Sequence, residues 1–257
     1  MRIVVFSGTT EGRELSRRLA AAGAEVTVCV ASEYGSEEQG RCPGVETRTG
    51  ALSAGEKAEL LRGAALCVDA THPYARHVTD SVRTACAAAG VRCLRLLRAP
   101  SDTGEALVVG SAAEAAALLA EREGRVLLST GARELPAYAG LDPVRLYPRI
   151  LPSHESLAAC EALGIPHRNI IAMQGPFTRE MNAATLRQYG IRYLVTKDGG
   201  APGGFPEKAD AARETGAELI VLRRPEEEGL DFEQVWKVCK TLLDGAAIEQ
   251  KTKGENP

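Results

Sequence analysis

The sequence predicts an α/β protein made of two Rossmann-like lobes, each a mostly parallel sheet with helices on both faces. Three observations predict this fold. Strand-type and helix-type segments alternate along almost the whole chain. Several strand segments are continuous apolar runs, as is typical of parallel strands covered on both faces. A polar break near residues 100–105 separates two series of such segments. We therefore expect an N-terminal lobe over 1–100, a C-terminal lobe over 105–250, a cleft between them and a polar tail over 251–257.

In the N-terminal lobe the apolar runs and the turns between them define the elements. Strands are expected at 2–6, 25–30, 45–49, 66–70 and 92–97. Helices are expected near 12–22, 53–62 and 76–89. The pattern restarts after the polar break. Strands are expected there at 126–129, 144–147, 169–172, 193–196 and 218–222, and helices near 112–122, 155–163, 178–189, 206–215 and 232–243.

Composition excludes several classes of protein. The 257 residues are 44% hydrophobic, which is enough for a substantial core, and the formal net charge is −3. A nucleic-acid-binding protein would show a basic face or stripe, and none is evident. No apolar run approaches the roughly 18 residues that span a membrane. We expect a cytoplasmic protein with no nucleic-acid or membrane partner, as a monomer or weak homo-oligomer.

The seven cysteines are odd in number, scattered along the chain and never arranged as C-x-x-C. This pattern predicts neither a disulfide framework nor a zinc site. Cys29 and Cys67 fall in expected buried strands, where cysteine acts as a small apolar side chain. We therefore expect no metal site.

The first strand runs into a Gly/Thr turn and then into a helix. Such a turn presents backbone N–H groups and hydroxyls at the positive end of the helix, where anions bind. It differs from the G-x-G-x-x-G fingerprint because its two glycines are four residues apart. Packing alone also explains a glycine turn here, so phosphate binding remains one of two interpretations. The turn residues are Gly8, Thr9, Thr10, Glu11, Gly12 and Arg13.

Ligands of open parallel sheets bind beyond the carboxyl ends of the strands. In the N-terminal lobe these ends carry Ser32 after the second strand, and Thr71, His72 and Tyr74 after the fourth. Each has an alternative interpretation. Thr71 would serve equally well as a helix N-cap, and His72 as a turn residue held in extended geometry by Pro73.

The strand ends of the C-terminal lobe are rich in glycine and charge. The candidate ligand-binding residues there are Gly131, Arg133, Arg149, Gln174, Gly175, Lys197, Asp198, Gly199 and Lys208. Lys197 follows a buried apolar strand directly and precedes Asp198 and two glycines, which favours contact with an anion. Arg133 has the alternative interpretation of a solvated surface residue, and Gly175 that of an ordinary loop glycine.

Together these segments resemble the precorrin-6A reductase family of cobalamin biosynthesis, including its cobalt-precorrin-6A reductases. The similarity covers residues 1–243 approximately. The Thr71-His72-Pro73-Tyr74 and Gln174-Gly175-Pro176-Phe177 segments are its most specific parts. It departs at Gly199, where the family usually has serine, so a hydroxyl contact is not expected there.

The resemblance implies an NADPH-dependent oxidoreductase that reduces a double bond of a polycarboxylate tetrapyrrole, giving the 6B form. The turn residues from Gly8 to Arg13 would then bind NADPH, with Ser32 near its ribose and Thr71 and His72 beside the nicotinamide. His72 or Tyr74 would be the catalytic proton donor, unless water or the macrocycle itself serves. The candidates of the C-terminal lobe would bind substrate. Two alternatives remain: an S-adenosylmethionine-dependent tetrapyrrole methyltransferase, and a non-catalytic nucleotide-binding module.

Overall fold

The computed structural model describes residues 1–254, except the side chains of residue 202 and of residues 248–254. The chain folds into two compact units. Unit 1 comprises Met1–Ala99 together with the segment from Pro225 onward, and unit 2 comprises Pro100–Arg224. The last segment of the chain therefore belongs with the first.

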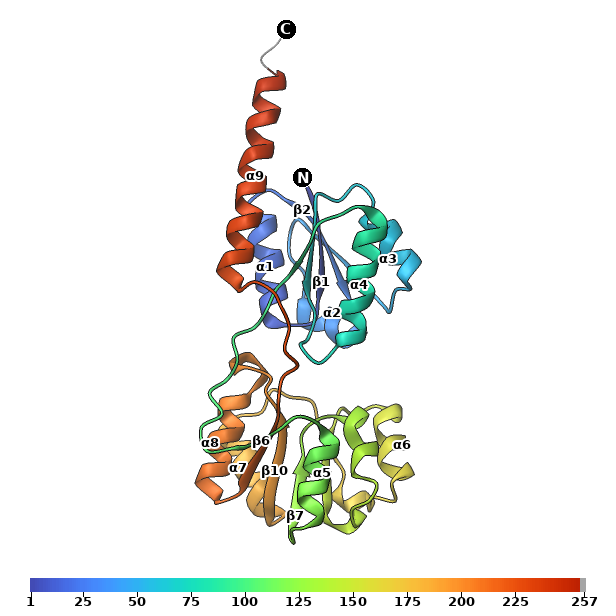
Figure 1. Ribbon diagram of the computed structural model, residues 1–257, viewed down its shortest axis with the longest axis vertical. Coiled ribbons are helices and arrows are strands. Elements are labelled where there is room, and N and C mark those ends of the chain that lie inside the picture. Colours follow the sequence, from blue (N-terminus) through green and yellow to red (C-terminus); the bar gives the residue numbers. More distant parts are fainter. Residues whose placement is uncertain (255–257) are drawn as a thin grey trace. The chain divides into compact units, whose positions relative to one another are not determined.

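Unit 1 contains a five-stranded parallel sheet with the order β3-β2-β1-β4-β5 (Figure 1). Its strands are β1 (Arg2–Ser7), β2 (Glu25–Val30), β3 (Val45–Thr49), β4 (Leu66–Ala70) and β5 (Cys93–Arg95). Alternate side chains of β1 enter two different cores. Ile3 and Val5 lie in one hydrophobic cluster, and Val4 and Phe6 in another. The sheet is buried on both faces, which explains its continuous apolar strands.

The helices of unit 1 cover both faces of this sheet. They are α1 (Thr10–Ala21), α2 (Glu33–Gln39), α3 (Ala54–Leu61), α4 (Arg76–Ala89) and α9 (Phe232–Gly254). Leu15 of α1 and Val235 of α9 pack in the cluster of Ile3, and α9 lies beside α1 (Figure 1). Leu61 of α3 and Val82 of α4 pack in the cluster of Val4.

Unit 2 contains a six-stranded parallel sheet with the order β6-β11-β10-β7-β8-β9. Its strands are β6 (Leu107–Val109), β7 (Arg125–Leu128), β8 (Leu146–Ile150), β9 (Ile171–Ala172), β10 (Ile191–Lys197) and β11 (Glu218–Leu222). Its α-helices are α5 (Ala112–Ala120), α6 (His154–Ala162), α7 (Arg179–Gln188) and α8 (Phe205–Thr215). Short 3₁₀ helices run over Ala132–Tyr138, Pro143–Arg145, His167–Asn169 and Ala201–Gly203. Both faces are again covered, with Leu119 of α5 on one and Leu186 of α7 on the other.

The predicted α/β fold with two parallel, doubly covered sheets is confirmed. The structure differs from the predicted lobes at one point: the segment from Pro225 returns to unit 1, where α9 packs on α1. Periodicity shows that a segment is helical but not which sheet buries it. Helix α9 also runs to Gly254, into the predicted polar tail, and residues 255–257 lie outside the described part of the chain.

Three further elements differ from the prediction. The sequence pattern missed α2 and β6, which are short, and it placed β8 too early. Residues 143–145 form a 3₁₀ helix, and the strand continues to Ile150. Among the described residues no helix combines the length and apolar character needed to cross a membrane.

Candidate cofactor and substrate sites

The carboxyl ends of β1 and β4 form a topological switch point in unit 1. From β1 the chain proceeds to β2 and β3 on one side, and it later returns to β4 on the other. Such a reversal opens a crevice in which α/β proteins bind ligands. The turns after the two strands lie against each other here, since a Cβ on Gly8 would stand 3.5 Å from the backbone nitrogen of His72. The predicted cofactor residues Gly8, Thr71 and His72 therefore come together.

Thr9 and Gly12 have structural roles in this turn. The Thr9 hydroxyl accepts a hydrogen bond from the Gly12 N–H at 3.1 Å as the N-cap of α1, and donates to the Ala70 carbonyl at 3.0 Å. A Cβ on Gly12 would approach Ala70 Cβ and Ser7 Oγ to 2.8 Å. Glycine at this position thus lets α1 pack closely on β1 and β4. The helix dipole adds partial positive charge at this end of α1.

The two charged side chains of the first turn of α1 have partners within unit 1. Glu11 forms a two-point ion pair with Arg98, with contacts of 2.7 and 2.6 Å. Burial raises the pKa of Glu11, but the hydrogen bonds and charge of Arg98 outweigh it, so the net pKa is lowered. Arg13 binds the Glu38 carboxylate at 3.0 Å and the Glu38 carbonyl at 2.6 Å. Glu11 therefore anchors the chain after β5, and Arg13 reaches toward α2.

Ser32 begins a helix that the sequence pattern missed. Its hydroxyl accepts from the Gly35 N–H at 3.2 Å as the N-cap of α2. The residue is exposed at the carboxyl end of β2, the strand next to β1. In the structure the hydroxyl has the role of a helix cap, and its placement near an adenosine ribose stays a prediction.

The Thr71 hydroxyl is held by a buried network and is not an N-cap. It donates to Asp69 Oδ1 at 2.7 Å and lies 3.1 Å from the Thr79 hydroxyl. Helix α4 begins five residues later, with Ala75 as its N-cap and no side-chain hydrogen bond there. The N-cap interpretation of Thr71 is therefore wrong. Its hydroxyl fixes the shape of the turn that carries His72.

A buried arginine ties this turn to the returning segment of the chain. Arg95 in β5 donates to the Thr71 carbonyl at 2.9 Å and to Asp69 Oδ1 at 3.2 Å. It also forms an ion pair with Glu227 at 2.7 Å. The side chains of Arg95 and Asp69 are 4% and 1% exposed, so each charge depends on the other for compensation. The sequence pattern did not single out Asp69, Arg95 and Glu227 as site residues. The charge of Arg95 inside an expected apolar strand could have indicated them.

His72 and Tyr74 lie close together on the turn after β4. Their ring centroids are 5.7 Å apart, and His72 Nδ1 accepts from the Tyr74 N–H at 3.4 Å. Both residues are half-buried, so part of each remains exposed to solvent. The structure thus places both predicted proton donors at the switch point of unit 1.

Unit 2 has its own switch point, between β7 and β10. The chain leaves β7 for β8 and β9 on one side, whereas β10 and β11 lie on the other. Gly131, which follows β7, adopts a φ of 86° and begins the 3₁₀ helix that carries Glu134. Lys197 at the end of β10 forms an ion pair with Glu134 at 2.7 Å. The predicted residues Gly131 and Lys197 thus meet at this edge.

Asp198 organises the backbone around this second switch point. Its Oδ1 accepts from the Gly200 N–H at 3.1 Å and the Ser101 N–H at 3.2 Å. Arg224 approaches the same oxygen to 3.5 Å. Gly199 packs closely, since a Cβ there would stand 3.4 Å from Gly203 Cα. Asp198 therefore anchors both segments that connect unit 2 to the rest of the chain.

Arg149 lies inside β8 and is buried, which corrects its predicted position in a loop after the strand. Its guanidinium stands 4.1 Å from the Phe177 ring centroid and donates to Asn182 Oδ1 at 2.8 Å. Burial lowers its pKa to about 10. Lys208 of α8 is half-buried and donates to the Gly203 carbonyl at 3.1 Å. Burial lowers the pKa of Lys208 to about 8, and the positive charge of Arg149 acts in the same direction.

The remaining predicted residues of unit 2 lie at its surface. Gln174 and Arg133 are exposed, and Gly175 precedes Pro176 through a cis peptide bond. Within the described residues Arg133 has no ion pair or hydrogen bond, so its exposed side chain is compatible with both interpretations, a solvated residue and a ligand contact. Sequence analysis missed Asn182 and Phe177 as the partners of Arg149, because only the tertiary fold brings α7 to β8.

The comparisons with known proteins agree with this architecture. Residues 2–241 match the family model described as precorrin-6x reductase CbiJ/CobK. A cobalt-precorrin-6A reductase from Priestia megaterium is 33% identical, covering 94% of this chain and 98% of its own length. A cobalt-precorrin-6A reductase from Methanothermobacter thermautotrophicus is 36% identical, and the match covers 95% of this chain and 83% of that protein. A precorrin-6A reductase from Rhodobacter capsulatus is 30% identical, covering 94% and 92%.

A solved structure supports the same conclusion. The structure described as CobK precorrin-6A reductase superposes with a TM-score of 0.72 at 27% identity, covering 92% of this chain and 95% of that one. These findings disfavour the methyltransferase and the non-catalytic module. The chain belongs to the precorrin-6x reductase CbiJ/CobK family, the oxidoreductases of cobalamin biosynthesis that include precorrin-6A and cobalt-precorrin-6A reductases.

Proposed function

We propose that the protein catalyses the NADPH-dependent reduction of a double bond of precorrin-6A, or of its cobalt form, to the 6B product. The observation that carries the nicotinamide part is the switch point of unit 1. There the N-terminus of α1 and the turn after β4 meet at the carboxyl edge of a β3-β2-β1-β4-β5 sheet. This is the place and strand order in which Rossmann-type sheets bind dinucleotides.

The residues of this edge fit a dinucleotide. Gly8 is exposed and carries no side chain over the turn, so a phosphate group can approach the backbone. Thr10 opens α1, whose partial positive charge favours an anion. Arg13 in the first turn of α1 reaches Glu38 near the end of α2, and Ser32 caps the start of the same helix. The Ser32 hydroxyl near the expected ribose suits a 2′-phosphate better than a carboxylate would, which favours NADPH over NADH.

Unit 2 supplies the positive side chains that a polycarboxylate macrocycle requires. Burial and mutual repulsion depress the pKa of Lys208, a condition that a bound carboxylate relieves. Arg149 presents a planar guanidinium that suits two-point binding of a carboxylate. We assign these two residues, with Lys197 and Arg133, to substrate binding.

The reduction needs a hydride and a proton. NADPH supplies the hydride when it is bound, and the macrocycle or a protein group accounts for the proton. His72 and Tyr74 are our candidates for the proton donor, and the contacts of Arg95 with Asp69 and Thr71 hold the turn that carries them. Their main contribution is therefore orientation at the crevice, with proton donation by either group as a testable addition.

The decisive experiment is anaerobic incubation of the purified protein with NADPH and precorrin-6A, and separately with the cobalt form. The absorbance of cofactor and macrocycle is followed together. We expect one NADPH consumed for each macrocycle reduced, and the faster substrate assigns the protein to one route. NADPH binding without reduction of either macrocycle would overturn the proposed reaction and leave the cofactor site intact. The cytoplasmic location and the monomeric or weakly associated state remain predictions of the sequence.

A further inference from the structure

Three cysteines that are far apart in the sequence come together under helix α4. Cys67 lies in β4, Cys86 in α4 and Cys93 in β5. Cys67 and Cys93 are register partners on neighbouring parallel strands, so their side chains point to the same face of the sheet. Cys86 lies on the buried face of α4 that packs against it. All three sulfurs lie within 4.8 Å of one another.

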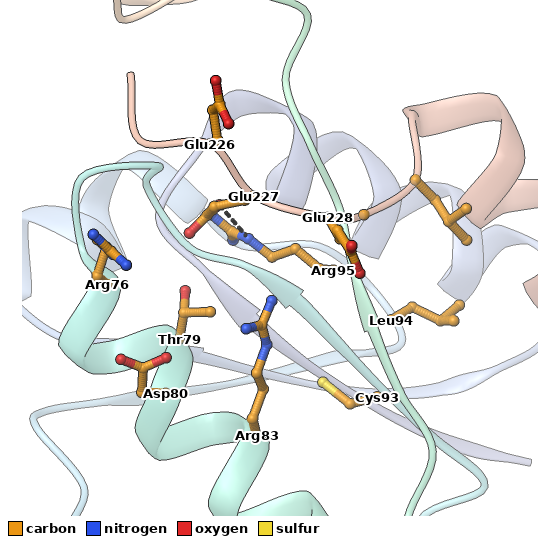
Figure 2. Close-up of a pocket in the computed structure, with 12 residues that line it drawn as sticks. Arg76, Thr79, Asp80, Arg83, Cys93, Leu94, Arg95, Glu226, Glu227 and Glu228 are labelled. Atoms are coloured by element: carbon orange, nitrogen blue, oxygen red, sulfur yellow. Dashed lines mark hydrogen bonds and ion pairs between the residues drawn. The ribbon is translucent and has the colours of Figure 1, made fainter. Parts of the chain in front are cut away.

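Two of the three cysteines are buried in an apolar core, and the third borders a cavity. Cys67 and Cys86 are buried, at 0% and 2% exposure, in the apolar cluster of α3 and α4. Cys93 is half-buried and lines a cavity of about 550 Å³ within unit 1 (Figure 2). The third sulfur therefore connects a buried pair of thiols to solvent.

The lining of this cavity carries both signs of charge. Four carboxylates line it, those of Asp80, Glu226, Glu227 and Glu228, together with the guanidinium groups of Arg76 and Arg95, and Glu227 is paired with Arg95 (Figure 2). Arg83 also lines it, and its positive charge favours a thiolate at Cys93. The cavity thus provides an entry path for a cation and a countercharge for sulfur.

The three thiols influence one another's pKa because their sulfurs lie close together. Hydrogen bonds from the Cys67 and Cys86 thiols lower the pKa of Cys93, and the charges of Arg83 and Arg95 act in the same direction. The same hydrogen bonds raise the pKa of Cys67 well above its ordinary value. Three adjacent cysteine sulfurs offer one ion the electron donors that soft metal ions select, and each sulfur binds as a thiolate.

We propose that Cys67, Cys86 and Cys93 form a binding site for one soft, thiophilic d¹⁰ cation, reached through the cavity that Cys93 lines. With metal–sulfur bonds of about 2.3 Å, three sulfurs around one ion stand about 4 Å apart in a plane. The sulfurs therefore need to move little from their present separations. Binding forms three metal–sulfur bonds and releases the protons that the sulfurs hold, with no transfer of electrons. The site is independent of the proposed reduction.

The test uses the full-length protein, reduced and free of metal, under anaerobic conditions. Cd²⁺ is titrated as the probe, and the sulfur-to-cadmium charge-transfer band in the ultraviolet is followed, with Cu⁺ in a parallel competition assay. We expect one ion for each chain, with release of protons and with no competition from Mg²⁺. Cys86→Ala and Cys93→Ala should each weaken binding by more than the roughly 10- to 100-fold that loss of an outer-shell partner costs.

Cys42→Ala is the matched control, because Cys42 is a free cysteine outside the cluster. It should leave the affinity and the stoichiometry unchanged. X-ray absorption on the wild-type cadmium complex makes the test independent of the folding of any variant, and we expect three sulfur neighbours at one distance. A first shell of oxygen or nitrogen, absence of stoichiometric binding, or loss of the ion in Cys42→Ala would each overturn the proposal.

Discussion

Both units have a parallel sheet with a switch point, but the residues at the two switch points differ in chemical type. In unit 1 the edge between β1 and β4 is built from a glycine turn, a helix N-terminus and hydroxyls. In unit 2 the edge between β7 and β10 is built from charged side chains, above all the Lys197–Glu134 ion pair. The element after β7 is a 3₁₀ helix, which gives a weaker array of aligned N–H groups than α1.

The difference matches the two ligands in our proposal. A dinucleotide presents a compact phosphate group, which the fixed N–H groups of a helix N-terminus suit. A macrocycle presents carboxylates spread around a large ring, which separate side chains such as Arg149 and Lys208 suit better. We therefore assign the cofactor to the backbone donors of unit 1 and the substrate to the cationic side chains of unit 2.

The sharpest comparison is between the arginines that hold the two strand-end aspartates. Arg95→Met leaves Asp69 and Glu227 without their buried partner, and breaking such a pair costs about 3–5 kcal/mol. Arg224→Met should cost less, about 1.5–3 kcal/mol, because the Arg224 side chain is 14% exposed and lies 3.5 Å from the Asp198 carboxylate. Urea denaturation followed by circular dichroism measures both. A larger loss of stability in Arg224→Met than in Arg95→Met would contradict our inference that the Arg95 ion pairs contribute more to stability than the Arg224 ion pair.

Two glycines test whether close packing shapes the cofactor edge. Gly12→Ala places a methyl group 2.8 Å from Ala70 Cβ, and such overpacking costs about 1–3 kcal/mol. We also expect weaker NADPH binding, because α1 must move. Gly55→Ala is the matched control in α3, since a Cβ there meets nothing within 4 Å and should stabilise the protein by about 0.5–1 kcal/mol. Thermal unfolding measures both, and equal effects would refute the packing role of Gly12.

Arg13 tests the phosphate assignment in unit 1. Loss of a hydrogen bond to a charged group costs about 1.5–3 kcal/mol. Arg13 already pairs with Glu38, so we expect Arg13→Ala to show the low end of this range. The NADPH dissociation constant should therefore rise about tenfold. Arg18→Ala on the same helix is the control, because Arg18 faces Glu233 and Trp236 of α9. Fluorescence titration gives both constants. An unchanged constant in Arg13→Ala would remove it from the cofactor site.

Lys208 gives the smallest and most specific effect, a pH dependence that belongs to unit 2. Its pKa of about 8 means that its charge is lost as the pH rises through this value, so substrate affinity should fall there by at most about tenfold per pH unit. Lys208→Arg should shift this loss to higher pH. The substrate dissociation constant measured between pH 7 and 9 tests this, and NADPH binding should not share the inflection.

The lowered pKa of Lys208 also affects the free energy of unfolding, in the direction opposite to its effect on substrate affinity. The pKa of Lys208 in the folded protein lies below the ordinary value of 10.5, so the unfolded chain binds more protons between about pH 8 and 10.5. The contribution of this group to the free energy of unfolding therefore rises with pH in that range. Substrate affinity and stability should move in opposite directions, which separates loss of the charge from general unfolding.

Local sequence patterns predicted most elements and the sheet edges that carry the candidate ligand-binding residues. Helix α4 and strands β2, β3, β4 and β11 have the predicted bounds, because apolar periodicity and glycine turns act over a few residues. The turns after β1, β4 and β10 were found for the same reason. The family resemblance added the reaction, which neither periodicity nor spacing specifies.

The tertiary structure decided what depends on contacts between distant segments. It assigned α9 to unit 1, buried Arg149 beside Phe177, closed the Asp69–Arg95–Glu227 network and gathered Cys67, Cys86 and Cys93. The sequence alone determined that parallel strands would end in glycine, hydroxyl and charged residues. Strand order and helix packing determined which of these ends meet, because a strand's neighbours in a sheet are set by the path of the whole chain and not by its own residues.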